Sequence, residues 1–150
     1  MKAIQDIAKS LHFVANNIES VALPYLKDIE GSTKQRIHNK GKDSNNQIIG
    51  TNSKRGGKYS PGYEKRKSKI VGSNIYPINL QLKGDLLRSF TVGISNGVYV
   101  LRFQDDQNTL KAAYNEERYN ADIYKPSNDQ LDDAKEVLID SMKELLQEIF

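Results

Sequence analysis

Residues 78–103, INLQLKGDLLRSFTVGISNGVYVLRF, decide how the chain can fold. They end in two β-rich runs, residues 91–94 and 98–103, which flank Asn96-Gly97. Asn-Gly between alternating strands is typical of a hairpin, because both central turn residues need positive φ. Both faces of the second run are largely apolar, with Val98 and Val100 on one face and Tyr99, Leu101 and Phe103 on the other. We therefore expect an antiparallel hairpin near the middle of a sheet, with other elements packed on it.

A turn at Gly84-Asp85 precedes the hairpin and leads into a short apolar segment, residues 86–90. Gly84 is expected to adopt a backbone conformation that residues with a Cβ atom resist. Asp85 is expected to cap the next helical turn by accepting hydrogen bonds from the N–H groups of Leu87 or Arg88. We interpret this pair as a structural turn and not as a catalytic site.

A long amphipathic helix is predicted at the N-terminus. Residues 2–22 carry apolar side chains at steps of three and four residues, which is the helical period. Pro24 is expected to kink or interrupt this helix, and a helical continuation as far as Ile37 fits the same pattern.

The chain after the hairpin is predicted to hold a short helix, a short strand and a last helix. Residues 105–118 predict the short helix, around Leu110, Ala113 and Tyr114, and residues 121–124 predict the strand. The last helix begins at Ser127, which forms a capping box with Gln130. The predicted fold class is α+β, in which a long N-terminal helix and a C-terminal helix pack on a small antiparallel sheet.

The length and composition bound the type of protein. The 150 residues predict a single domain, residues 1–150, and the absence of cysteine excludes disulfides and thiolate metal sites. No apolar run approaches the roughly 18–20 residues of a membrane span, so no membrane partner is expected. The N-terminus does not have the pattern of a secretory signal, which favours a cytoplasmic origin.

Charge is distributed unevenly along the chain. Residues 34–69 hold 11 Lys and Arg against two acidic residues, a local charge of +9. Residues 127–150 hold seven Asp and Glu against two lysines, a local charge of −5. A chain with such opposite regions can bind its own copies head to tail, or meet two different partners.

The basic region coincides with a stretch, residues 38–74, that is rich in Gly, Asn, Ser, Lys and Arg. Its composition predicts a long flexible loop or arm, mobile in the monomer and ordered on assembly, because it offers little apolar area to offset the entropy of ordering. The residues expected to contact a neighbouring copy or partner are Ile48, Ile49, Tyr59, Tyr63, Lys65, Arg66 and Lys67.

Known catalytic and metal-binding patterns do not fit this sequence. A nucleotide-binding loop at residues 50–58 would need a glycine where Asn52 stands and a hydroxyl side chain of Ser or Thr where Tyr59 stands. A calcium loop from Asp43 would need a glycine where Ile48 stands and a glutamate where Lys54 stands. We expect no catalytic site, no metal, no cofactor and no enzymatic activity.

Three stretches in order resemble a known family. They are RIHNKGKDS (residues 36–44) leading to QIIG (47–50), then YSPGYEKRK (59–67), then LQLKGDLLRSF (80–90). This order is similar to small neck proteins of tailed bacteriophages and prophages, the tail-completion or head–tail joining group. The resemblance covers about residues 36–150. The chain departs from the family pattern at Lys83, where Thr or Ser is usual, and at residues 114–119, where many relatives have His-x-x-Gly.

The resemblance implies a structural, non-enzymatic virion protein that forms a ring around the DNA channel. It implies as partners further copies of the chain, neighbouring virion proteins such as the portal, an adaptor or the tail tube, and non-specific contact with packaged DNA. The protein would reside in the virion, and in the host cytoplasm during assembly. A ring needs a heterologous contact that closes by rotation, for which a basic arm and an acidic helix supply complementary patches.

An alternative function stays open from the residues alone. A nucleic-acid-binding protein without catalytic activity could use the basic residues 34–69 to hold phosphates, with Tyr59 and Tyr63 stacking on bases. Either function leaves the basic region as the part of the chain that meets a partner.

Overall fold

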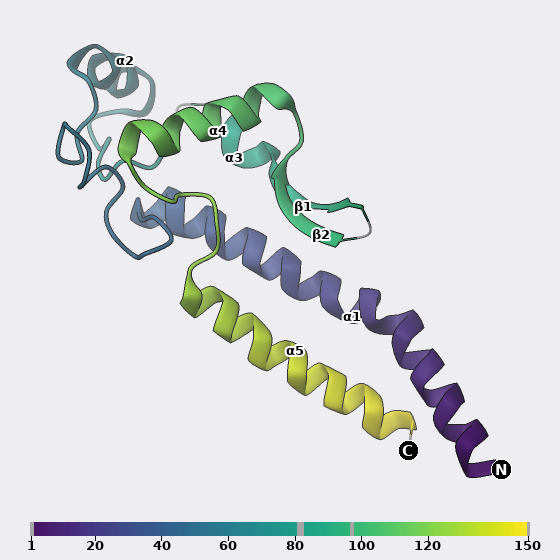
Figure 1. The fold of residues 1–150 in the computed structure, drawn as a ribbon. Helices are drawn as coiled ribbons and strands as arrows, with labels where there is room; N and C mark the ends of the chain where they lie inside the picture. Colours follow the sequence, from purple (N-terminus) through teal and green to yellow (C-terminus); the bar gives the residue numbers. More distant parts are fainter. Residues whose placement is uncertain (1, 81–82, 97, 150) are drawn as a thin grey trace.

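Two long helices, α1 (Lys2–Lys40) and α5 (Asn128–Ile149), pack against each other in the computed structural model. Figure 1 shows them side by side and antiparallel, so that the two termini lie at the same end of the molecule. The structure describes residues 2–80, 83–96 and 98–149. Their arrangement confirms the predicted α+β class, with α1 packed on α5 and a two-stranded antiparallel sheet. Within these residues the sheet contacts α1, whereas α5 packs on α1 and not on the sheet as predicted.

Helix α1 continues through Pro24 and ends only at Lys40. Figure 1 shows it bending along its N-terminal half, so the proline is compatible with a helix that is curved but unbroken. The helix ends at Gly41, whose φ of 58° is left-handed and whose N–H donates to the carbonyl of Ile37. A Cβ on Gly41 would come within 2.7 Å of Pro77, so this end of α1 requires a glycine.

The predicted hairpin is present as β1 (Phe90–Ser95) and β2 (Val98–Phe103). The strands pair antiparallel from Phe90 opposite Phe103 to Ser95 opposite Val98, and Asn96 in the turn has the expected positive φ of 52°. Gly97, the other central turn residue, lies outside the described residues.

The expectation that this hairpin lies within a larger sheet is wrong for the described part of the chain, where the sheet has two strands. Residues 121–124, predicted as a third strand, form no strand. The backbone N–H groups of Ile123 and Tyr124 donate instead to the Glu116 carboxylate, at 2.8 and 3.1 Å, so they are satisfied without strand pairing. Tyr124 still packs on the hairpin, 5.1 Å from the Phe103 ring centroid.

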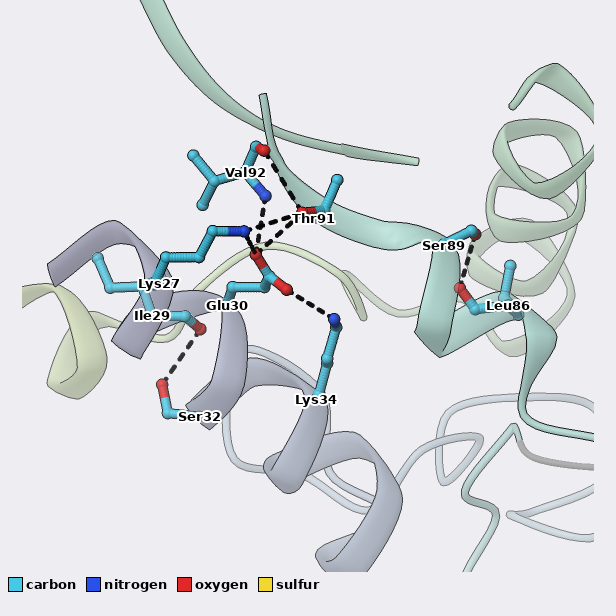
Figure 2. A network of polar contacts seen from close by, with 9 residues as sticks. All are labelled: Lys27, Ile29, Glu30, Ser32, Lys34, Leu86, Ser89, Thr91 and Val92. Carbon is cyan, nitrogen blue, oxygen red and sulfur yellow. Dashed lines mark hydrogen bonds and ion pairs between the residues drawn. The ribbon is translucent and has the colours of Figure 1, made fainter. Parts of the chain in front are cut away.

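One carboxylate, that of Glu30, joins α1 to β1 (Figure 2). It accepts hydrogen bonds from Lys27 and Lys34, each at 2.7 Å, and from the backbone N–H of Val92 at 3.0 Å. The Thr91 hydroxyl lies 3.1 Å from the same carboxylate. Partial burial alone raises the pKa of Glu30, but the bonds from Lys27, Lys34 and Val92 outweigh it and lower the pKa from 4.5 to about 2.

A buried cation, Arg36, joins α1 to the start of α5. Its guanidinium donates to the carbonyls of Ile123 (2.7 Å) and Lys125 (2.9 Å) and to the side chain of Gln130 (2.7 Å). Gln130 also accepts from the N–H of Ser127 at 2.9 Å, which confirms the predicted capping box. The start of α5 is thus held by both a local cap and a long-range cation.

Helix α4 (Asp106–Tyr119) follows the hairpin where a short helix was predicted, but it presents a different face to the core. Leu110 is 70% exposed, and Ala113 and Tyr114 are exposed as well. The buried face consists of Asn108, Ala112 and Tyr119. The three residues around which the helix was predicted are therefore not the ones that face the core.

The predicted loop at residues 38–74 is folded into the core. It contains an unpredicted helix, α2 (Pro61–Val71), and its side chains Ile49 and Tyr59 are 0% and 3% exposed. The turns that lead to Ile49 are held by Asp43, which accepts from the N–H groups of Asn45 and Gln47 at 2.9 and 3.0 Å. The premise that this composition cannot bury apolar area is wrong, because two well-placed anchors and local turns suffice.

The core itself joins this segment to the rest of the chain. Its buried residues are Ile37, Ile49, Tyr59, Ile75, Ile78, Leu87, Phe90, Ala112, Tyr119, Ile123 and Tyr124. No helix within the described ranges is long and apolar enough to cross a bilayer.

Candidate functional site

The basic segment, defined as residues 38–74, is organised around a buried lysine. The Lys67 amine donates to the Tyr59 hydroxyl at 2.7 Å and to the Asn79 side-chain carbonyl at 2.6 Å, and Lys67 is 1% exposed. Burial lowers the pKa of Lys67 from 10.5 to about 8 and raises the pKa of Tyr59 well above its ordinary value. These two side chains stabilise the fold of the segment.

Burial removes three of the seven predicted contact residues from a surface role. Ile49, Tyr59 and Lys67 are enclosed by their own chain and cannot reach a partner in this conformation. Tyr63 is half-buried, with its ring centroid 5.0 Å from that of Tyr59. The exposed members of the set are Ile48, Lys65 and Arg66.

The burial of Lys67 could have been predicted from residue spacing, although not from composition. Tyr63 and Lys67 are four residues apart and share one face of α2, and Tyr59 lies four residues before Tyr63, just ahead of the helix. Because lysine is rarely buried, the sequence alone favoured a solvent-exposed side chain for Lys67. The side chains that α2 does expose are Pro61, Lys65, Arg66, Lys69, Ile70 and Val71.

Helix α5 exposes an acidic and apolar surface. Its exposed large apolar side chains are Leu131, Val137, Ile139 and Leu146. Exposed carboxylates lie between them, and those without an ion pair in the described part of the chain are Asp132, Asp133, Glu136 and Glu144. Helix α1 packs against α5, where the Tyr25 and Ser141 hydroxyls share a hydrogen bond, and it leaves these apolar side chains exposed.

A basic pocket lies between residues 52–58 and the C-terminal end of α4. It has a volume of 560 Å³, and its cations are Lys54, Arg55, Lys58 and Arg118. Glu117 is the carboxylate in its lining, and the exposed Tyr114 lies at its edge. The sequence separates the two sides of this pocket by about 60 residues, so only the fold brings them together.

The turn at Gly84-Asp85 is structural, though not in the way predicted. Gly84 has a φ of 81° and forms the N-cap of α3 (Asp85–Ser89), as its expected backbone freedom requires. Asp85 is the first residue of the helix and pairs with the Arg88 side chain, while the N–H of Arg88 donates to the Gly84 carbonyl. The predicted side-chain cap by Asp85 is therefore wrong, because the helix begins one residue earlier than expected, with Gly84 as its N-cap.

No group of His, Asp or Glu among the described residues could hold a metal ion. No protein-family model matches the chain, and no curated protein or solved structure shows significant similarity to it. The resemblance to phage neck proteins therefore rests on the motifs of the sequence, and the expected absence of enzymatic activity stays a prediction.

Proposed function

We propose that the protein is a structural component of the neck or tail of a tailed bacteriophage, where its copies assemble head to tail into a ring around the DNA channel. The order of the three motifs supports this family. The observation that carries the assembly role is the pair of unlike surfaces on α2 and α5, one basic and apolar, the other acidic and apolar.

The two surfaces lie apart on one chain. Figure 1 shows α2 at the end of the molecule that is remote from the termini, while α5 runs toward the termini. A basic surface that is distant from its acidic complement can meet it only on another copy. Such a contact is heterologous, and it closes into a ring when the rotation between copies divides a full turn.

The apolar residues supply most of the affinity in this contact. Exposed ion pairs contribute about 0–1 kcal/mol each, so charge alone does not hold a ring together. Ile70 on α2 and Ile139 and Leu146 on α5 are exposed apolar side chains that would become buried. Lys65 and Arg66 opposite the carboxylates of α5 would set the register and exclude like-charged contacts.

Light scattering and electron microscopy of the purified protein test this proposal. The parent is expected to form annular particles with a mass that is a multiple of 17.0 kDa. Ile139→Ser with Leu146→Ser should give monomers, whereas the control Leu110→Ser, at an equally apolar and more exposed position of α4, should leave the ring intact. A parent that stays monomeric at every concentration, or a control that dissociates as the test variant does, would contradict the proposal.

A further inference from the structure

The basic pocket has a rigid frame. Gly50 lies against α4, where an added Cβ would come within 3.0 Å of the Tyr119 ring, so the loop can approach the helix only with a glycine there. The N–H of Gly57 donates to the Gly50 carbonyl at 2.6 Å, and the N–H of Ser53 donates to the same carbonyl at 2.9 Å. The loop that carries Lys54 and Arg55 is therefore closed on itself and attached to the core.

The cations around the pocket are not neutralised. Lys54, Arg55, Lys58 and Arg118 form no salt bridge within the described part of the chain, and Glu117 is the single carboxylate among the lining residues. Arg118 rests on the Tyr119 ring, 5.7 Å from its centroid, which holds the guanidinium at the pocket. Four cations around a hollow concentrate positive potential there and attract an anion.

We propose that this pocket binds the phosphodiester backbone of DNA without regard to sequence. The ligand chemistry follows from the lining, because Lys and Arg neutralise phosphates, and the side chains of Asn52, Asn120 and Tyr114 are of the kinds that donate hydrogen bonds to phosphate oxygens. The cations are spread over an exposed rim, which suits a chain of phosphates better than one small anion. The loop at residues 50–58 also lacks the glycine and hydroxyl pattern of loops that bind a nucleoside triphosphate.

This site goes beyond the proposed assembly role and is separate from it. The residues that line the pocket belong neither to the exposed surface of α2 nor to that of α5. In a ring built through α2 and α5, each copy would carry one such pocket outside the contact between copies. The assembly proposal and the DNA-binding proposal can fail independently, because the first is tested by the mass of the particles and the second by affinity for DNA.

Anisotropy of a labelled 20-base-pair duplex over a series of salt concentrations tests the pocket. Lys54→Glu with Arg55→Glu and Lys58→Glu should weaken binding about tenfold or more at low salt, and should lower the slope of log affinity against log salt by about three. Arg118→Gln changes the opposite side of the pocket, and it should lower the slope by about one. Light scattering should show the mass of the parent for both variants.

A matched control makes the same change of charge elsewhere. Lys9→Glu with Lys40→Glu and Lys83→Glu alters three exposed lysines that do not line the pocket, and it should keep the slope of the parent. The proposal is overturned if the control loses as much slope as the loop variant, or if the parent does not bind the duplex. A different ligand at the pocket would also overturn the proposal. That result would be pyrophosphate or an acidic peptide that binds the parent, does not bind the variant Lys54→Glu with Arg55→Glu and Lys58→Glu, and is not displaced by the duplex.

Discussion

Glu30 on α1 accepts a hydrogen bond at 3.0 Å from the backbone N–H of Val92, which is 62 residues away on β1. This contact ties the hairpin to the helix through one side chain (Figure 2). The same carboxylate accepts from Lys27 and Lys34, so a single charge satisfies donors from both elements.

The low pKa of Glu30 predicts an acid-sensitive contribution to stability. A folded-state pKa of about 2 against 4.5 stabilises the folded chain fully above pH 4.5, and the contribution is lost as the pH falls toward 2. Glu30→Gln should lower the free energy of unfolding by about 1–3 kcal/mol at pH 7, and should show a smaller fall between pH 5 and pH 2 than the parent. Urea titrations at each pH give both quantities. The control Glu136→Gln, at an exposed position, should behave as the parent does. If Glu30→Gln and the parent lose the same stability between pH 5 and pH 2, Glu30 is not the source of the acid sensitivity.

Adjacent isoleucines test whether the basic segment is part of the fold. Ile49 is 0% exposed and Ile48 is 41% exposed. Ile49→Ala should cost about 2–4 kcal/mol of stability, because a buried side chain is lost and a cavity remains. Ile48→Ala should change stability by less than about 0.5 kcal/mol. Similar urea midpoints for the two variants would show that the segment does not pack as described.

Arginine usually lies at the surface, but Arg36 is buried, and its replacement is expected to destabilise the fold strongly. Arg36→Met leaves the carbonyls of Ile123 and Lys125 without their charged donor, which should cost about 2–4 kcal/mol. The neighbouring exposed residue supplies the control, since Gln35→Met makes a similar change on the solvent side of α1. Thermal unfolding of the two variants measures the difference, and equal melting temperatures would contradict the role given to Arg36.

The lowered pKa of Lys67 predicts that the free energy of unfolding rises in mildly alkaline solution. Between pH 8 and pH 10.5 the unfolded chain keeps the Lys67 proton while the folded chain has released it, so raising the pH favours folding. The raised pKa values of Tyr59, Tyr63, Tyr119 and Tyr124 act in the opposite direction as the pH approaches 10, where unfolded tyrosine ionises. The parent should therefore gain on the order of 1 kcal/mol between pH 8 and pH 9.5.

Lys67→Met is the variant that checks this rise. It retains most of the length of the side chain and removes the titrating amine, so its stability should not rise between pH 8 and pH 10. Urea unfolding at pH 7.5, 8.5 and 9.5 provides the comparison. A rise of the same size in the variant would mean that another group is responsible.

Sequence reasoning was sound where local rules govern the chain. The hairpin at Asn96, the cap at Ser127 and the backbone of Gly84 depend on residues close in sequence, and the structure contains all three. It was wrong where a charged residue is buried, as with Lys67. Composition treats lysine as soluble surface, but the hydroxyl and amide that accept from this amine lie 8 and 12 residues away.

The basic pocket shows a different limit of sequence reasoning. Its two sides come from residues 52–58 and from the end of α4, and nothing local relates them. Their meeting depends on the close approach of Gly50 to Tyr119, which is a tertiary contact. The charge count of the basic region was visible in the sequence, but its division into a pocket, an α2 surface and a buried lysine was not.

Head-to-tail assembly is tested most directly by mixing two variants that are each defective on one surface. Ile139→Ser with Leu146→Ser lacks the α5 surface, and Lys65→Glu with Arg66→Glu and Ile70→Ser lacks the α2 surface. Each variant alone should be a monomer of 17.0 kDa by light scattering. Their equimolar mixture keeps one intact contact, and it should give a dimer of about twice that mass that does not grow further. A mixture that stays monomeric, at concentrations where the parent assembles, would contradict a contact between α2 of one copy and α5 of the next.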